Sequence, residues 1–253
     1  MLALQRQRRI LELLAEQGSL LTRKVAQTLK VTEETVRRDF EKLETEGVLV
    51  RSHGGAVRSD ATRRETPSSE REIQNADEKR RIAAQALPLI RSGETVLFDP
   101  STTVLHLARL LPDLPLTVLT NSLPIALVLA AKPAIQTVLL GGTLIPSSNS
   151  CIGWPAEHTL DAYRIDRAFL SCRGLDPAKG LSEASEEPAR LKRRVIERAD
   201  STCLLADQSK VGLRSNYFYA KLSDVDTWIT DSRPPAPLRK TLRSLGLQLQ
   251  IAP

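Results

Sequence analysis

Polar side chains that could bind an anion follow several short apolar segments of this sequence. They are Asp99 with Ser101, Thr102 and Thr103, then Thr120 with Asn121 and Ser122, and then the glycine pair Gly141 and Gly142. The first two groups each open a predicted helix, where hydroxyls and free backbone amides bind anions, phosphate above all. This pattern indicates a site for a phosphorylated ligand.

A fourth polar group consists of Asp207, Gln208, Ser209 and Lys210. The ammonium of Lys210 could neutralise a bound anion, or the carboxylate of Asp207 could accept hydrogen bonds from sugar hydroxyls. Glu183, in a polar stretch after Gly180, is a candidate for a lid or for another sugar contact. Hydroxyls, carboxylates and one ammonium together predict a phosphorylated polyol as the ligand.

The alternative is that these polar residues only cap helices and form turns, as the strand-to-helix loops of any α/β protein require. For one loop alone that alternative is the better interpretation. Four such loops at one edge of a sheet favour a ligand cleft. The aromatic residues Trp154, Trp228 and those of 217–219 are assigned to packing and not to the cleft.

A second set of candidate binding residues lies near the N-terminus, on a helix that begins after Thr32. At 100° per residue, one face of this helix is apolar and must meet a core. Its members are Val36, Phe40 and Leu43. The candidate contacts to DNA from this segment are Thr32, Thr35, Arg37, Arg38 and Lys42.

These side-chain types suit the major groove of DNA. Arginines reach guanine edges or phosphates, and threonine hydroxyls bond to phosphates. A short helix is predicted over 22–29, and a tight turn joins it to the helix that begins after Thr32. Two helices joined in this way form a helix-turn-helix. The alternatives are that Arg37 and Arg38 form a solvated helix face, or that the small helical domain binds protein instead of DNA.

A hairpin is predicted after Gly47, with strands over 48–51 and 56–58 and a tight turn between them. It forms a plausible wing beside the two helices. Arg51 and His53 lie on this wing and are candidate DNA contacts. His53 could contact phosphate or only hold the turn.

Composition narrows the class of protein. The 253 residues are 41% hydrophobic and 26% charged, which are ordinary values for a globular protein. The longest stretch without charge, 133–156, is too polar for a membrane span. The basic N-terminus is followed at once by Glu12 and Glu16, so the apolar region of a secretory signal is missing. We therefore expect a cytoplasmic protein without membrane contact.

Other chemistries have no support in the sequence. The three cysteines, Cys151, Cys172 and Cys203, have neither a CxxC spacing nor a histidine at metal-ligand spacing, so disulfides and metal sites are not expected. No nucleophile stands beside a base, and no cofactor is predicted. Residues 1–66 hold 13 basic and 10 acidic side chains, and the other 187 residues hold 23 and 20. The short N-terminal part is thus denser in excess positive charge, which favours a polyanionic partner there.

Strands and helices alternate along the rest of the chain, which predicts a mostly parallel sheet covered on both faces. The predicted strands are 95–98, 116–119, 137–140, 168–171, 202–206, 227–230 and 248–251. The predicted helices include 103–110, 122–131, 189–198 and 238–245, after one that starts near Asp77. In such a sheet, ligands bind beyond the carboxyl ends of the strands. The fold class is therefore α/β, with a DNA-binding domain over 1–58, a linker over 59–75 and an effector-binding domain over 76–253.

The N-terminal residues carry a resemblance to a known family. Residues 32–40 (TEETVRRDF), with Leu43, Gly47 and the wing residues 51–56 (RSHGGA), resemble the DNA-binding signature of the DeoR family of bacterial transcriptional regulators. The family more often has a serine that caps the second helix where this chain has Leu21, and we expect Thr22 to cap one residue later.

The resemblance continues through the larger domain. The polar loop groups named above, together with Asp166, Phe169, Gly174, Gly180, Lys192, Thr230 and Asp231, are similar to the DeoR-type sensor domain. That resemblance implies a fold of the ribose-5-phosphate isomerase type and a phosphorylated sugar as effector. Pro100 departs from the family pattern, because it lacks a backbone N–H that could bind phosphate.

The resemblance and the residues together predict a transcriptional regulator, most simply a repressor of a carbohydrate-utilisation operon. Its expected partners are double-stranded operator DNA, a phosphorylated sugar and further copies of itself in a dimer or tetramer. The alternative is a sugar-phosphate isomerase that uses Asp99 or Glu183 with Lys210. A stand-alone enzyme would not need the helix-turn-helix.

Overall fold

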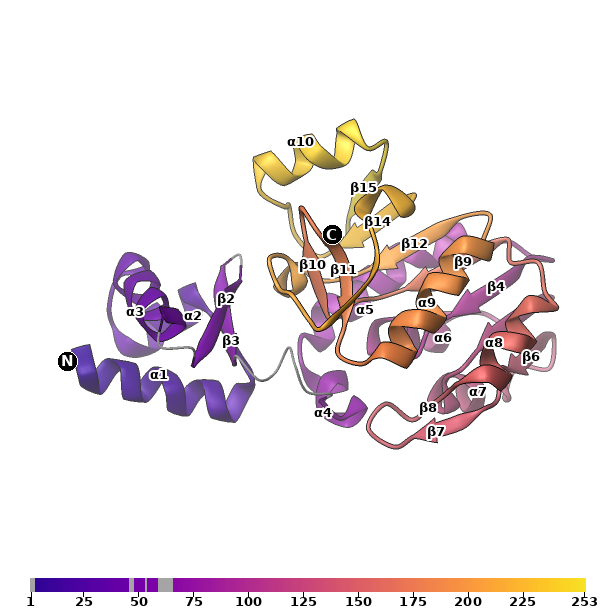
Figure 1. The fold of residues 1–253 in the computed structure, drawn as a ribbon, viewed down its shortest axis with the longest axis horizontal. Coiled ribbons are helices and arrows are strands. Elements are labelled where there is room, and N and C mark those ends of the chain that lie inside the picture. The colour runs from indigo at the N-terminus through magenta and orange to yellow at the C-terminus, as the bar shows by residue number, and fades with distance from the viewer. Residues whose placement is uncertain (1–2, 46–47, 53, 59–65) are drawn as a thin grey trace.

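The chain forms a small N-terminal domain and a larger C-terminal domain (Figure 1). The computed structural model describes residues 3–45, 48–52, 54–58 and 66–253. None of the helices in these ranges is both long enough and apolar enough to span a bilayer.

The described residues of the small domain form three helices and three short strands. In chain order they are α1 (Ala3–Gln17), β1 (Ser19–Leu21), α2 (Thr22–Leu29), α3 (Glu33–Thr45), β2 (Leu49–Ser52) and β3 (Gly55–Arg58). The strands form an antiparallel sheet in the order β1-β3-β2, so the predicted hairpin is present. Strand β1 was not predicted, because three residues between two helices give no visible alternation.

One apolar cluster holds this domain together. Val36, Phe40 and Leu43 of α3 are each at most 2% exposed, as the helical spacing predicted. They pack against α1, α2 and the sheet through residues such as Ile10 and Ala56. Each such buried side chain contributes about 1.5–3 kcal/mol, so this cluster fixes the position of α3.

The larger domain is built on a seven-stranded sheet in the order β15-β14-β12-β9-β4-β5-β6. Its strands are β4 (Thr95–Phe98), β5 (Leu116–Thr120), β6 (Ile135–Leu139), β9 (Arg167–Leu170), β12 (Thr202–Leu205), β14 (Thr227–Thr230) and β15 (Gln248–Ile251). All neighbouring pairs are parallel, and the seven predicted strands are all present.

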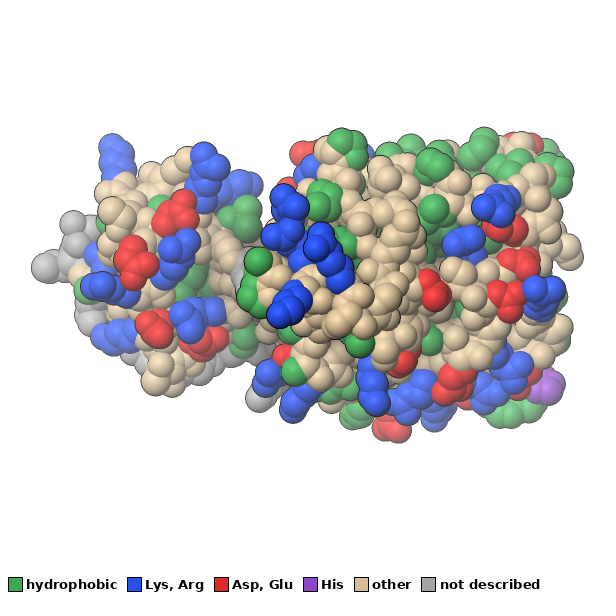
Figure 2. Space-filling view, turned by 90° about the horizontal axis from the view of Figure 1, so that it is seen from above, with side chains coloured by type: hydrophobic (Ala, Val, Ile, Leu, Met, Phe, Trp, Pro, Cys, Tyr) green, Lys and Arg blue, Asp and Glu red, His purple; other side chains and the backbone are tan. Residues whose placement is uncertain are grey.

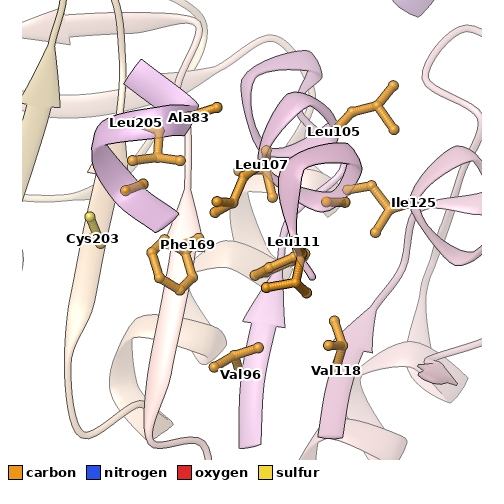
Figure 3. Packing of buried hydrophobic residues seen from close by; sticks show 14 of the residues in the cluster. Ala83, Val96, Leu105, Leu107, Leu111, Val118, Ile125, Phe169, Cys203 and Leu205 are labelled. Atoms are coloured by element: carbon orange, nitrogen blue, oxygen red, sulfur yellow. The ribbon is translucent and has the colours of Figure 1, made fainter. Parts of the chain in front are cut away.

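Helices cover both faces of this sheet. The helices of the larger domain are α4 (Ser68–Ile73), α5 (Ala76–Ala86), α6 (Thr102–Leu110), α7 (Leu123–Leu129), α8 (Trp154–Asp161), α9 (Glu186–Arg198) and α10 (Ala236–Ser244), with short 3-10 turns at Leu87–Leu89, Gln208–Lys210 and Leu222–Asp224. On β4, Val96 and Phe98 pack into the cluster formed with α5, α6 and α7 (Figure 3). Leu97 points to the opposite face, toward α8 and α9. The central strands are therefore buried on both sides, as their nearly unbroken apolar sequences indicated.

Several elements of the larger domain were not predicted. They are helix α8, the hairpin β7 (Thr143–Ile145) and β8 (Ser150–Ile152), and the antiparallel sheet of β10 (Gly174–Asp176), β11 (Gly180–Glu183) and β13 (Tyr217–Ala220). Strands of three or four residues carry too little periodicity to be recognised. Helix α4 lies inside the segment predicted as a linker. Of the aromatic residues assigned to packing, Trp228 and Tyr219 are buried, whereas Trp154 is 70% exposed and stacks on His158.

Candidate functional site

Helix α3 begins at a turn that the local sequence defines. Lys30 ends α2 in the left-handed conformation, with φ of 54°. The hydroxyl of Thr32 then accepts a hydrogen bond from the backbone amide of Thr35 at 3.2 Å, and the two threonine hydroxyls lie 2.8 Å apart. Thr32 therefore caps α3, and both threonines stand at its N-terminal end.

The predicted basic residues lie on the outer face of α3. The side chains of Arg37 and Arg38 are 59% and 79% exposed, and Lys42 is also exposed. The arginines pair with acids one turn earlier, at 3.4 Å from Arg37 to Glu33 and 3.5 Å from Arg38 to Glu34. Figure 2 shows basic and acidic side chains interspersed on the small domain. Exposed pairs of this kind contribute at most about 1 kcal/mol, so the arginines can exchange their acids for phosphates.

A buried carboxylate that the sequence analysis missed fixes α3 against α1. Asp39 is 4% exposed and accepts hydrogen bonds from Gln7 at 3.2 Å and from both Nε and Nη2 of Arg6. Asp39 stands on the inner side of α3, where an acid requires a partner. Arg6 is 33 residues away in the sequence, so no local pattern could identify the pair.

The wing is joined to α3 and to β1. Arg51 donates its backbone amide to Glu44 at 2.8 Å and its guanidinium to the same carboxylate at 2.7 Å. Gly55 faces β1 so closely that a Cβ there would lie 2.0 Å from the carbonyl oxygen of Leu20. The predicted contact His53 lies outside the described residues.

The expectation that Thr22 caps the second helix is wrong. Thr22 is the first residue of α2 and is buried, and Leu21 occupies the cap position without a side-chain hydrogen bond. The amide of Thr22 instead donates to the carbonyl oxygen of Gly54 at 2.7 Å. The carbonyl oxygen of Gly54 in the wing turn thus accepts a hydrogen bond from the first amide of α2, in place of a capping side chain.

A cavity of about 350 Å³ lies at the carboxyl edge of the large sheet. One wall comes from the loops after β4, β9 and β12. A second wall is the segment 66–75, which contains α4 and which we call the strap. The end of α1 and the start of β1 also border the cavity, through residues such as Gln17 and Ser19. The cavity therefore lies where the larger domain, the strap and the DNA-binding domain meet.

Five of the predicted effector residues line this cavity, namely Ser101, Thr102, Thr103, Glu183 and Lys210. Ser101 caps α6, since its hydroxyl accepts the amide of Val104 at 3.2 Å. Thr102 and Thr103 form the first turn of that helix, whose N-terminal end is the end that favours anions.

Two predicted carboxylates are buried behind the cavity wall and position its loops. Asp99 accepts the amides of Ser101 at 3.0 Å and Ser171 at 2.8 Å. Asp207 accepts the amide of Ser209 at 3.0 Å and the side-chain amide of Asn75 at 3.3 Å. Asn75 belongs to the strap, so this second carboxylate joins the strap to the loop that carries Lys210.

The remaining predicted effector residues do not line the main cavity. The hydroxyl of Thr120 donates to the backbone of Phe98, and the side chain of Asn121 donates to the backbone of Cys151. Ser122 caps α7 and lines a smaller neighbouring cavity of about 110 Å³. Gly141 and Gly142 form the turn into β7, with φ of 74° and 108°, which L side chains rarely adopt.

Lys192 of α9 joins two of the predicted carboxylates. Its ammonium lies 2.9 Å from Asp99, contacts Glu183 and donates to the carbonyl oxygen of Ser171 at 2.6 Å. Burial alone would lower the pKa of Lys192, but the two carboxylates raise it above the usual lysine value. The two carboxylates are thus held in place by a charged lysine.

Lys79 of α5 is a further cavity residue that sequence reasoning missed. It is 5% exposed, and its ammonium donates to the carbonyl oxygen of Arg71 in the strap. Burial, and then the positive charge of Lys210, lower the pKa of Lys79 to about 8. Its place on a predicted helix gave no sign of burial, because the packing of the strap on α5 follows no local pattern and the loop that carries Lys210 is distant in sequence.

A winged helix-turn-helix joined to an α/β domain with its own cavity defines the class of a DNA-binding transcriptional regulator with a sensor domain. Comparison with known families agrees with this class. The DeoR-like helix-turn-helix domain matches residues 6–62, and the DeoR C terminal sensor domain matches residues 74–232. The chain belongs to the DeoR family.

Individual proteins resemble the chain over its full length. The HTH-type transcriptional regulator YulB of Bacillus subtilis (strain 168) is 44% identical over 253 residues, covering 100% of this chain and 98% of the relative. The glycerol-3-phosphate regulon repressor of Escherichia coli (strain K12) is 31% identical over 248 residues, covering 98% of each.

Among solved structures, ribose 5-phosphate isomerase A of Methanocaldococcus jannaschii matches with 19% identity and a TM-score of 0.41, covering 54% of this chain and 55% of that one.

Proposed function

We propose that this regulator is a repressor of a carbohydrate-utilisation operon, controlled by a phosphorylated sugar that binds in the cavity at the sheet edge. The observation that carries the proposal is the lining of that cavity. It combines hydroxyls of Ser101, Thr102 and Thr103 at a helix start with the carboxylate of Glu183 and the ammonium of Lys210. Its volume of about 350 Å³ lies in the range of small-molecule sites.

The name of the Escherichia coli relative supports the chemistry of this proposal, since it is a repressor of a regulon named for a phosphorylated polyol. We propose the same ligand class for this chain. The helix start binds the phosphate, and the carboxylates accept hydrogen bonds from the hydroxyls.

For DNA, we propose that α3 enters the major groove. Arg37, Arg38 and Lys42 contact bases or phosphates, Thr32 and Thr35 contact phosphates, and Arg51 contacts the backbone from the wing. One winged domain offers few base contacts, so we propose a homo-oligomer, a dimer or a tetramer, that places recognition helices on repeated half-sites.

A thermal-shift screen tests the ligand. The purified chain is heated with a panel of pentose, hexose and triose phosphates and with the unphosphorylated parent of each. A ligand at 100 times its dissociation constant stabilises the folded state by about 2.7 kcal/mol, which raises the melting temperature of a protein of this size by roughly 5–10 °C. We expect such a shift for one phosphorylated sugar and not for its parent. A panel without any shift would contradict the proposal.

A further inference from the structure

Two lysines on the cavity wall have no acidic partner among the described residues. They are Lys79 of α5 and Lys210 of the loop after β12. Within the part of the chain that the structure describes, no carboxylate oxygen lies within 4.0 Å of either ammonium. Lys79 donates instead to a carbonyl oxygen of the strap, that of Arg71.

The third lysine of the same wall, Lys192, differs from these two because carboxylates neutralise its charge. Lys192 is buried as deeply as Lys79, yet it contacts the carboxylates of Asp99 and Glu183. A buried charge without an opposite charge is costly, and the lowered pKa of Lys79 is the expected response to burial beside a second cation. An anion that entered the cavity between Lys79 and Lys210 would supply the missing negative charge.

We propose that Lys79, together with Lys210, binds the anionic phosphate of the effector. This inference rests on the function proposed above and adds a residue and an orientation to it. The phosphate lies between Lys79, Lys210 and the start of α6, and the hydroxyls point toward Glu183, whose carboxylate is fixed by Lys192. A phosphorylated ligand thus has one favoured orientation in the cavity.

The same lysine connects the anion to the strap. Its ammonium already donates to the carbonyl oxygen of Arg71, near the end of α4, and a phosphate bound to the same ammonium would alter that hydrogen bond. The strap also donates from Asn75 to Asp207 and Ser209, beside Lys210. The strap follows the DNA-binding domain along the chain, so a change in the bonds of Lys79 acts next to the connection between the two domains.

The test compares Lys79→Met with a matched control. Lys132 is also partly buried and donates to backbone carbonyl oxygens, those of Ala108 and Leu111, away from the cavity. The full chain and its variants are titrated with inorganic phosphate at pH 7.5 and constant ionic strength, with the melting temperature as the readout. We expect wild type and Lys132→Met to be stabilised alike, and Lys79→Met to need at least tenfold more phosphate. Lys79→Arg should behave like wild type.

The panel of sugar phosphates separates this inference from the function on which it rests. If a sugar phosphate binds wild type and Lys79→Met within threefold of each other, the role of Lys79 is overturned and the proposed function stands. If neither phosphate nor any sugar phosphate stabilises wild type, both are overturned. Should Lys79→Met fail to fold, Lys210→Met tests the same pair, and an undiminished response to phosphate in that variant overturns the inference.

Discussion

At the scale of single residues, we propose that the exposed arginines of α3 contribute to the affinity for DNA. Arg38 is the more exposed of the two and forms a surface pair with Glu34. We expect Arg38→Ala to weaken operator binding by on the order of tenfold. The slope of log affinity against log salt should also become shallower by about 1, because one phosphate is no longer neutralised.

Fluorescence anisotropy with labelled operator DNA at several salt concentrations measures both quantities. Arg164→Ala is the matched control, because Arg164 is equally exposed and paired with Asp200 on the larger domain. If Arg38→Ala and the control have the same affinity and salt slope, Arg38 does not touch the DNA.

The pKa of Lys79 gives a prediction on pH. Burial and the charge of Lys210 lower this pKa to about 8, and Arg71 lowers it further, whereas Asp207 and Glu72 raise it. The positive charge of Lys79 is therefore progressively removed as the pH rises through 8. A sugar phosphate is a dianion throughout this range, since its second pKa is about 6. We expect its affinity for wild type to fall roughly fivefold between pH 8 and pH 9.

Isothermal titration calorimetry at pH 7.5, 8, 8.5 and 9 measures this dependence. Lys79→Arg keeps its charge over the whole range, so its affinity for the same ligand should stay constant. An affinity of wild type that is equally flat would contradict the assignment.

At the scale of elements, the contact between α1 and α3 orients the recognition helix. Asp39 is buried and accepts hydrogen bonds from Arg6 and Gln7. Asp39→Asn would leave the guanidinium of Arg6 without its counter-charge, at a cost of about 3 kcal/mol. We expect the small domain of this variant to unfold at lower denaturant concentration and DNA affinity to fall with it.

The control is Glu12→Gln, which removes an exposed pair with Arg9 and should change the free energy of unfolding by less than about 0.5 kcal/mol. Equal effects of the two substitutions would refute this role of Asp39.

The same elements show what the sequence could and could not predict. The spacing of Val36, Phe40 and Leu43 predicted the inner face of α3, because the helical period is a local property. The seven strands of the large sheet were recognisable for the same reason. Lys79 and Asp39 were not. Asp39 is paired with Arg6, which is 33 residues away, and Lys79 is buried between the strap just before it and the distant loop that carries Lys210. Thr120 and Asn121 have side chains that could bind a ligand, but they donate hydrogen bonds to the backbone of Phe98 and Cys151. Only the three-dimensional structure distinguishes a ligand contact from such a structural hydrogen bond.

At the scale of the whole molecule, we propose that two or more copies act together on DNA. We expect sedimentation velocity to give two or four times the mass of the chain at micromolar concentration, because one winged domain offers too few contacts for a specific operator. A monomer that binds its operator with nanomolar affinity would contradict this expectation.

We propose that the two domains are coupled through the cavity. The cavity is bordered by the large sheet, the strap and the end of α1, so a ligand there can favour one arrangement of the DNA-binding domains. Such couplings amount to about 1–3 kcal/mol, or roughly fivefold to 150-fold in affinity.

The most direct test measures operator affinity by anisotropy, with a duplex selected from random sequence by the protein itself. Each titration is run without ligand, with the phosphorylated sugar found in the thermal screen, and with its unphosphorylated parent. We predict that the phosphorylated sugar changes the affinity at least fivefold in wild type, that the parent sugar does not, and that Lys210→Ala keeps ligand-free binding but loses the response. An operator affinity that a bound sugar phosphate leaves unchanged would contradict the account.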